Sequence, residues 1–222
     1  MNRWAKSTAG EVLGALLFFA LAGAMAFAFS CFLRISVAEM YGKTASDFLL
    51  MTTQCALGLA GMTLPVLCER KLGLQLPPFI YTLYYAFLLC AVFLGEILSF
   101  YYLVPAWDIL LHLFSGAMLC ALGFVAADFL NRSSCGAASP ALLAAFAFCF
   151  SLAAGAVWEI YEYIMDGMLH MNMQKFADAR LVAYTGRQAL DDTMQDVMAD
   201  ALSALATAFA GYALMRKKRA QR

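Results

Sequence analysis

The sequence predicts an all-α protein, a polytopic bundle of about six transmembrane helices. Hydrophobic residues make up 64% of its 222 positions and charged residues only 14%, which is too apolar for a water-soluble domain of this length. Six apolar runs are also long enough to cross the hydrocarbon core of a bilayer, which takes ~20 helical residues. No soluble domain is expected between them, so residues 1–222 are interpreted as a single integral membrane domain. The predicted spans are 11–33, 47–68, 79–103, 107–130, 140–165 and 191–215.

The first span has some features of a cleavable signal peptide. Arg3 and Lys6 precede it, and Ala26-Phe27-Ala28 resembles a cleavage site. Its apolar stretch is nevertheless longer than the ~7–15 residues of signal peptides. We therefore expect the span to be retained, with cleavage as the alternative.

The distribution of Lys and Arg predicts the orientation in the membrane. The N-terminus, the second and fourth loops and the C-terminus carry ten of these residues, and the loops on the other face carry five. Because Lys and Arg favour the cytoplasmic side, both termini are expected there and the connection over 166–190 outside. The basic tail Arg216-Lys217-Lys218-Arg219 is interpreted as a stop signal that attracts anionic lipid, and not as a nucleic-acid site.

The last span begins with carboxylates, where a membrane helix should least favour them. Asp192, Asp196 and Asp200 are spaced i, i+4 and i+8, so they lie on one helical face. The other faces carry Ala, Leu, Met and Val. Because a charge facing lipid costs several kcal/mol, the acids are expected to face a protein-lined cavity that holds protons, a cation or a partner base.

Other spans carry acids at a matching depth. With the predicted orientation and a rise of about 1.5 Å per residue, Glu96, Asp108, Glu159 and Glu162 lie roughly 2–14 Å below the outer boundary. The cytoplasmic halves of the same helices hold mostly Ala, Leu, Phe, Gly and Cys. We therefore expect four helices to bring their acids into one site.

Spacing within the helices favours the convergence of particular side chains. Asp108 and His112 are spaced i, i+4, which places them on one face of a helix. Gly116 follows one turn later on that face, and Gly155 lies one turn before Glu159. These glycines are expected to let the helices approach closely beside the acids.

The acids have no Lys or Arg within their own spans, so something else must neutralise them. Protonation could neutralise some of them. A hard divalent cation such as Mg²⁺, Mn²⁺ or Ca²⁺ could neutralise several at once, and a ligand set of oxygens with a single imidazole favours these ions. The seven cysteines occur singly and without a CxxC pair, so neither a thiolate zinc site nor disulfides are expected. Arg187 is the nearest obvious cation and could pair with an acid or bind a substrate phosphate.

A short set of motifs in the second half of the chain resembles the VanZ-like membrane proteins and, more closely, the related YjdF-type inner-membrane proteins. The set comprises Trp107-Asp108-x-x-x-His112-x-x-x-Gly116, Glu159 with Glu162, Arg187, and Asp192-x-x-x-Asp196. The resemblance covers about residues 90 to 210. It implies a small multi-pass protein of the bacterial inner (cytoplasmic) membrane that acts on or near the cell envelope.

The first functional hypothesis is an outer-leaflet site that binds a divalent cation and acts on a lipid-linked or phosphorylated substrate. Asp108 and His112 would form an oriented acid–base pair. The ion would be held by Glu159, Glu162, Asp192 and Asp196, and the substrate by Arg187, Glu96 and Asp200. One alternative is a transporter or binding protein for protons or a divalent cation, and another is a structural partner whose acids pair with a second protein's cations. No nucleophile elbow or Gly-rich phosphate loop identifies a reaction.

Overall fold

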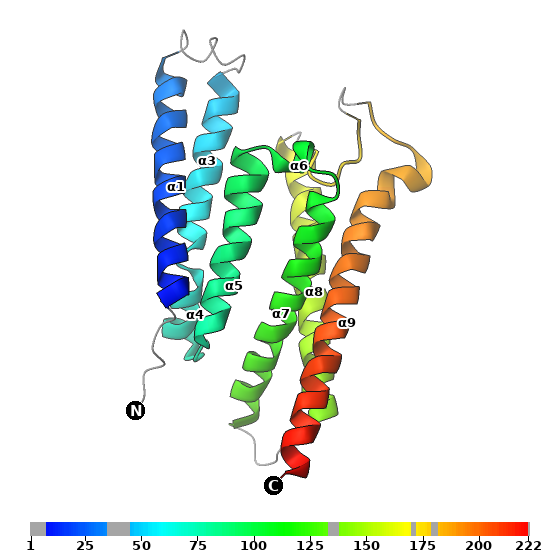
Figure 1. Cartoon of the computed structure of the whole chain (residues 1–222). Coiled ribbons are helices and arrows are strands. Elements are labelled where there is room, and N and C mark those ends of the chain that lie inside the picture. The colour runs from blue at the N-terminus through cyan, green and yellow to red at the C-terminus, as the bar shows by residue number, and fades with distance from the viewer. Residues whose placement is uncertain (1–7, 35–44, 133–137, 170–171, 179–181, 222) are drawn as a thin grey trace. The chain divides into compact units, whose positions relative to one another are not determined.

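The computed structural model describes residues 8–34, 45–132, 138–169, 172–178 and 182–221 (Figure 1). The chain is 86% helical and forms no strand within these ranges beyond an isolated antiparallel bridge between Ala177 and Ala183. Six helices are long and apolar enough to cross a membrane, which confirms the predicted fold class. The side on which the termini lie stays a prediction. These candidate spans are Ala9–Leu33, Phe48–Leu72, Pro78–Ile97, Trp107–Asn131, Pro140–Met168 and Gly186–Ala220.

The chain divides into two compact units, unit 1 over Met1–Trp107 and unit 2 over Asp108–Arg222. A single integral membrane domain over the whole chain therefore stays a prediction. Unit 1 packs around Leu17 and Leu21 of its first helix, against Cys55 and Leu88. Its elements are α1 (Thr8–Leu33), α3 (Ala45–Gly61), α4 (Leu64–Leu72), α5 (Pro78–Leu88), a π-helix (Leu89–Ile97) and α6 (Phe100–Leu103).

The second span of unit 1 is interrupted, where the sequence predicted one continuous run. Pro65 lies at the start of α4, and proline is tolerated in the first turn of a helix but not in its interior. The interruption leaves backbone carbonyls without helical partners. The hydroxyls of Tyr84 and Tyr85 donate to the carbonyls of Gly61 and Met62, at 2.8 and 3.5 Å.

The third span also departs from the predicted run over 79–103. It ends as a π-helix, and Ser99 then adopts a left-handed backbone conformation with φ of 61°, so that α6 is a separate short helix. Glu96 lies in the π-helix and accepts a hydrogen bond from Gln54 Nε2 at 2.7 Å.

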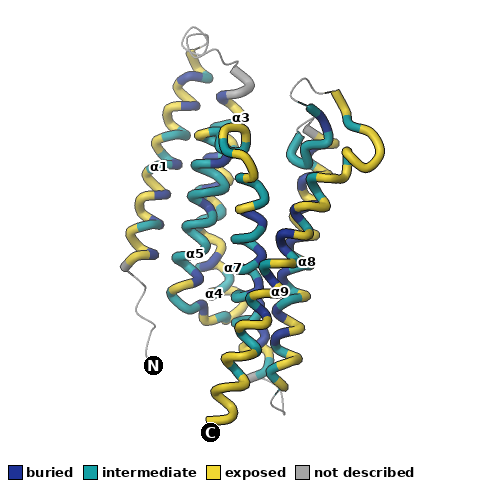
Figure 2. Tube along the Cα trace, turned by 45° about the vertical axis from the view of Figure 1, so that its right-hand side comes forward, coloured by how far each residue is buried: buried dark blue, intermediate teal, exposed yellow. Residues whose placement is uncertain are grey.

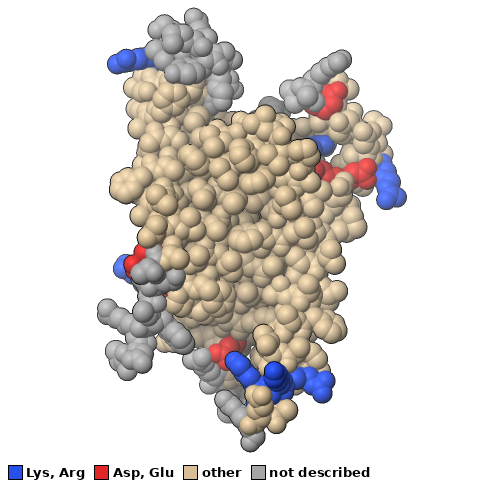
Figure 3. Space-filling model, in the orientation of Figure 1, with Lys and Arg blue, Asp and Glu red and all other residues tan. Residues whose placement is uncertain are grey.

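Unit 2 is a bundle of three long helices, α7 (Trp107–Arg132), α8 (Pro140–Leu169) and α9 (Asp191–Ala220), and Figure 2 shows buried and exposed positions alternating along α8 and α9. Cys120, Ala147, Ala204 and Ala208 form its apolar core. A Cβ atom on Gly123 would lie 2.8 Å from Ala147 Cα, so α7 and α8 cross at very close range. Figure 3 shows charged side chains gathered at the ends of unit 2, with basic ones where α9 ends. A 3₁₀-helix (Gly186–Leu190) leads into α9.

Candidate metal centre

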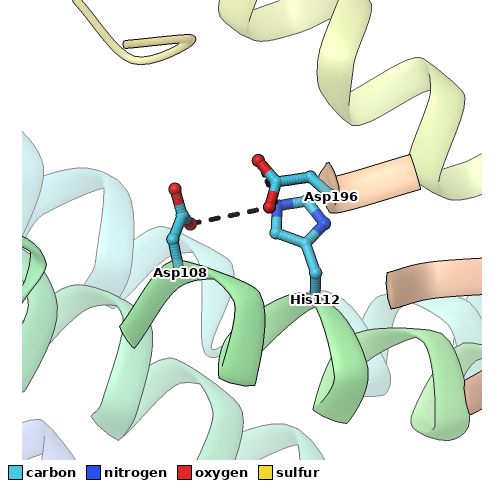
Figure 4. Close-up of side chains that lie close together, drawn as sticks. All are labelled: Asp108, His112 and Asp196. Carbon is cyan, nitrogen blue, oxygen red and sulfur yellow. Dashed lines mark ion pairs between the residues drawn. The ribbon is translucent and has the colours of Figure 1, made fainter. Parts of the chain in front are cut away.

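The imidazole of His112 lies at the centre of the acidic site in unit 2. His112 is 5% exposed, and its Nε2 atom lies 3.9 Å from each of three carboxylate oxygens. These oxygens come from three helices: Asp108 Oδ1 from α7, Glu159 Oε1 from α8 and Asp196 Oδ2 from α9. Figure 4 shows Asp108 and Asp196 pointing toward the imidazole from their two helices. The structure thus brings together acids that are far apart in the sequence.

Asp200 fixes the orientation of this imidazole. Its Oδ2 atom lies 3.2 Å from His112 Nδ1, and its Oδ1 accepts a hydrogen bond from Ser115 Oγ at 3.2 Å. Because an ionised carboxylate only accepts hydrogen bonds, a proton on Nδ1 would point toward Asp200, and Nε2 faces the other acids. A carboxylate that orients a histidine in this way is the usual outer partner of a metal-binding imidazole.

The structure places Asp108 beside His112, as predicted, but without the predicted hydrogen bond between them. The two side chains share one face of α7, as their spacing predicted, but 3.9 Å is too long for a hydrogen bond. The hydrogen bond of the imidazole goes to Asp200 instead, across to α9. Asp108 therefore faces His112 but does not orient its imidazole by a hydrogen bond.

Two glycines make room for this arrangement, as the sequence predicted. A Cβ atom on Gly116 of α7 would lie 2.8 Å from the carbonyl oxygen of Asp200, so α9 could not approach as closely. A Cβ atom on Gly155 of α8 would lie 2.3 Å from Asp200 Oδ2. The carboxylate of Asp200 therefore occupies the space that a side chain at position 155 would fill.

Two of the converging carboxylates are buried without hydrogen bonds. Glu159 is 6% exposed and Asp196 is 1% exposed. No described residue lies in good hydrogen-bond geometry to either carboxylate, although Thr193 and Gln174 lie close to that of Glu159. A buried polar group without a partner costs about 1–3 kcal/mol, and a charged group costs more. The described protein groups therefore leave at least the carboxylate of Asp196 without a hydrogen bond.

Lys175 is the one Lys or Arg among the described residues that the structure places on Asp108 and Asp192, and the sequence analysis missed it. Its ammonium donates hydrogen bonds to Asp108 Oδ2 and, at 3.0 Å, to Asp192 Oδ1. Burial favours the neutral amine, but the hydrogen bonds and charges of the two carboxylates outweigh it and raise the pKa of Lys175 above its ordinary value. Lys175 is therefore a cation at neutral pH.

The connection that carries Lys175 is tied to the helix ends. Asp166 of α8 accepts hydrogen bonds from the backbone N–H groups of Met173 and Gln174, at 2.7 and 3.0 Å. The side chain of Gln174 then donates to Thr193 Oγ1 of α9 at 2.9 Å. These bonds account for the burial of Asp166 and hold the segment before Lys175 over the site.

The remaining candidates lie in different surroundings. Glu162 is 5% exposed, and its Oε1 accepts a hydrogen bond from Trp158 Nε1 at 2.9 Å. The side chain of Arg187 is 96% exposed and pairs with Asp191, at 3.7 Å between Nε and Oδ1. Glu96 belongs to unit 1. None of these three is among the groups that meet at His112 Nε2.

The donor set suits a hard divalent cation. Asp108, His112 and Asp196 each offer a ligand atom, and these atoms all lie within 4.8 Å of one another. Glu159 adds a fourth candidate at 3.9 Å from the same nitrogen. Carboxylate oxygens with one imidazole match Mg²⁺ or Mn²⁺, which bind oxygens at about 2.0–2.2 Å and tolerate nitrogen. An ion between these groups would draw them inward by a modest amount.

The comparisons with known proteins bear on the family. A protein-family model described as predicted membrane protein (DUF2238) matches residues 17–217. No curated protein and no solved structure matches the chain. The resemblance to VanZ-like or YjdF-type proteins is not confirmed by these comparisons and stays a prediction. Since the matched residues make up most of the sequence, the chain belongs to the family of predicted membrane proteins DUF2238.

Proposed function

We propose that unit 2 binds a divalent cation among α7, α8 and α9. Asp108, His112 and Asp196 would be its ligands, with Glu159 as the fourth. The protein would use this ion, Mg²⁺, Mn²⁺ or Ca²⁺, to act on a lipid-linked or phosphorylated envelope substrate at the outer leaflet of the bacterial inner membrane. Compared with the roles assigned from spacing alone, Asp108 and His112 become ligands instead of an acid–base pair.

The observation that carries the proposal is the set of unsatisfied oxygens on Glu159 and Asp196. Protonated carboxyl groups would neutralise the charge, but they would also hydrogen-bond to one another or to neighbouring acceptors. The two carboxyl groups do not hydrogen-bond to each other, and Asp196 has no hydrogen-bond partner among the described residues. A cation placed between them would satisfy several oxygens at once, and His112 Nε2 faces the same space.

The surroundings of the site suit an amphiphilic substrate. On the same turns as Glu159 and Asp196, the outer faces of α8 and α9 expose Ile160, Met194 and Met198. A lipid tail could therefore lie against these faces while its polar head reaches the acids. A divalent cation would supply Lewis-acid polarisation of a phosphoryl oxygen and a more acidic bound water.

The packing of unit 2 supports a site that opens on one side only, and so disfavours the transporter alternative. Ser151 is fully buried and donates to the carbonyl of Gly116, one turn beyond His112. Beyond this bond lies the apolar core of Cys120, Ala147 and Ala204. Among the described residues, no charged group continues from the acids through this core toward the C-terminal end of α9.

Thermal denaturation of the purified protein with and without metal tests the proposal. A ligand present at a hundredfold excess over its dissociation constant stabilises the folded state by about 2.7 kcal/mol. We expect this gain with Mg²⁺, Mn²⁺ or Ca²⁺ for the wild type and its loss in Asp196→Asn. Asp191→Asn is the matched control, because Asp191 lies on the same helix with a half-exposed side chain and should leave the metal response intact.

The two halves of the proposal fail in different ways. If none of the three ions raised the melting temperature of the wild-type protein, the proposed metal centre would be ruled out. A protein that binds the ion but neither binds nor alters any phosphorylated lipid would leave the metal centre in place and remove the assigned substrate.

A further inference from the structure

We infer that Lys175 is the residue that binds the anionic group of the substrate, a phosphate that also contacts the proposed cation. This inference rests on the proposed metal centre and names the substrate group that the centre receives. It replaces Arg187, the residue that the sequence suggested for this role, with a residue from the connection between α8 and α9.

Lys175 lies where a metal-bound anion would need a partner. Its ammonium contacts Asp108 Oδ2, while Asp108 Oδ1 faces His112 Nε2 and the proposed ion. One carboxylate therefore separates the ammonium from the cation site. A phosphate has several oxygens, so it could bind the ion through one and the ammonium through another.

The ammonium also has capacity left for an anion. An ammonium group carries three N–H donors, and the described residues take two of them, through Asp108 and Asp192. The side chain of Lys175 is 40% exposed, in contrast to the 6% or less of His112 and Asp196. A ligand can therefore reach Lys175 from outside the helix bundle.

Electrostatics gives a reason for the anion to arrive together with the cation. In the metal-free site, the ammonium neutralises part of the charge of Asp108 and Asp192. A divalent cation bound to the other oxygen of Asp108 would place two positive groups on one carboxylate, and they would repel each other. A phosphate between them removes that repulsion, so metal and anion should each strengthen the binding of the other.

The unusual backbone conformation of Lys175 indicates that the position of its side chain has a function and is not an incidental contact. Its φ is 43°, in the left-handed region that side chains with a Cβ atom rarely adopt. The backbone N–H of Lys175 donates to the carbonyl of Asn172 at 3.3 Å, and the two residues before Lys175 are tied to Asp166. Strained backbone that is fixed by its surroundings is typical of functional sites.

Binding measurements on the purified full-length protein test the inference. Isothermal titration with Mn²⁺ alone gives the metal affinity, and titration of the Mn²⁺-loaded protein with inorganic phosphate or with short-chain phosphatidic acid gives the anion affinity. For Lys175→Gln we expect metal binding that is several-fold tighter, because a competing cation is gone, and anion binding that is about tenfold weaker. Lys175→Arg should keep most of the anion binding, and Arg187→Gln, which removes the same charge from an exposed position, should change neither affinity.

The expected changes have opposite signs, which separates this role from a structural one. If Lys175→Gln weakened both affinities, or left anion binding at the wild-type level, the inference would be wrong while the metal centre stood. If Arg187→Gln alone weakened anion binding, Arg187 would hold the role and the inference would be overturned. A wild type that does not bind Mn²⁺ would instead overturn the proposed function itself. If Lys175→Gln does weaken anion binding, the two anion affinities of the wild type identify the source of the phosphate. Tighter binding of phosphatidic acid indicates a lipid headgroup, and tighter binding of inorganic phosphate indicates a soluble phosphate.

Discussion

Substituting Gly155 with alanine should weaken the proposed metal centre without touching any of its ligands. The added Cβ atom would lie 2.3 Å from Asp200 Oδ2, whereas ordinary contacts begin at 3.4 Å. The carboxylate must therefore move by about 1 Å, and its 3.2 Å hydrogen bond to His112 has only about 0.3 Å to spare before it is lost. His112 would then lose the partner that orients it.

The size of the effect follows from the role of Asp200. Loss of an outer partner of a metal-binding histidine typically weakens metal affinity by about 10–100-fold. At a metal concentration that stabilises the wild type by about 2.7 kcal/mol, a tenfold weaker affinity leaves about 1.4 kcal/mol. Melting curves over a Mn²⁺ titration would measure this difference, together with the stability of both proteins in the absence of metal.

Gly167→Ala supplies the control for this experiment. Gly167 lies on the same helix, and an added Cβ atom there would meet nothing within 4 Å. This variant should respond to Mn²⁺ as the wild type does, and the better helix propensity of alanine could add up to about 1 kcal/mol of stability. If Gly155→Ala bound Mn²⁺ as tightly as Gly167→Ala, Asp200 would not orient a metal ligand and the reasoning would be refuted.

Three further predictions concern the rest of the structure. Gly123→Ala should lower the stability of the metal-free protein by about 1–3 kcal/mol, because its Cβ atom would meet the backbone of Ala147 and force α7 and α8 apart; thermal denaturation without metal measures this loss. Asp166→Ala should speed amide hydrogen exchange at Met173 and Gln174, whose N–H groups lose their acceptor, and unchanged exchange by mass spectrometry would contradict the anchoring of this connection. Reporter fusions should place both termini in the cytoplasm and the connection between α8 and α9 outside, whereas a cytoplasmic signal from that connection would invert the predicted orientation.

The six spans could be predicted from the sequence because crossing a membrane requires long apolar runs, which composition alone reveals. The interruption after Gly61 and the π-helix ending at Ile97 could not be predicted in this way. Both are changes in backbone hydrogen bonding within apolar sequence, and hydropathy does not register them. The proline at position 65 was the available signal for the first of these.

The convergence of acids from α7, α8 and α9 was predictable for a similar reason, although the expected contribution of Glu96 from a fourth helix stays a prediction. Charged groups within a membrane span must face protein, and helical spacing shows which of them share a face. The partner of each acid was not predictable, because His112 could reach Asp108 on its own helix or Asp200 on another, and only the helix packing decides between them.

Lys175 was beyond sequence reasoning because its position depends on the path of a connection. The region between the last two spans carries Lys175, Arg180 and Arg187, and only Arg187 was considered as a partner for the acids. Arg187 was the natural choice because it lies nearest to α9 in the sequence. The connection that follows α8 is instead held by hydrogen bonds to Asp166, and this places the ammonium of Lys175 at Asp108 and Asp192.

The three helices that meet at His112 enter the membrane at different times during synthesis. The ribosome makes α7 and α8 before α9. Asp108, His112 and Glu159 are therefore inserted into the bilayer before their partners on α9, Asp196 and Asp200, have been synthesised. A cation held among all three helices can bind tightly only after this last insertion. Ion uptake would then mark the completion of the bundle, and cells short of the metal would accumulate fully translated but loosely assembled chains exposed to membrane proteases.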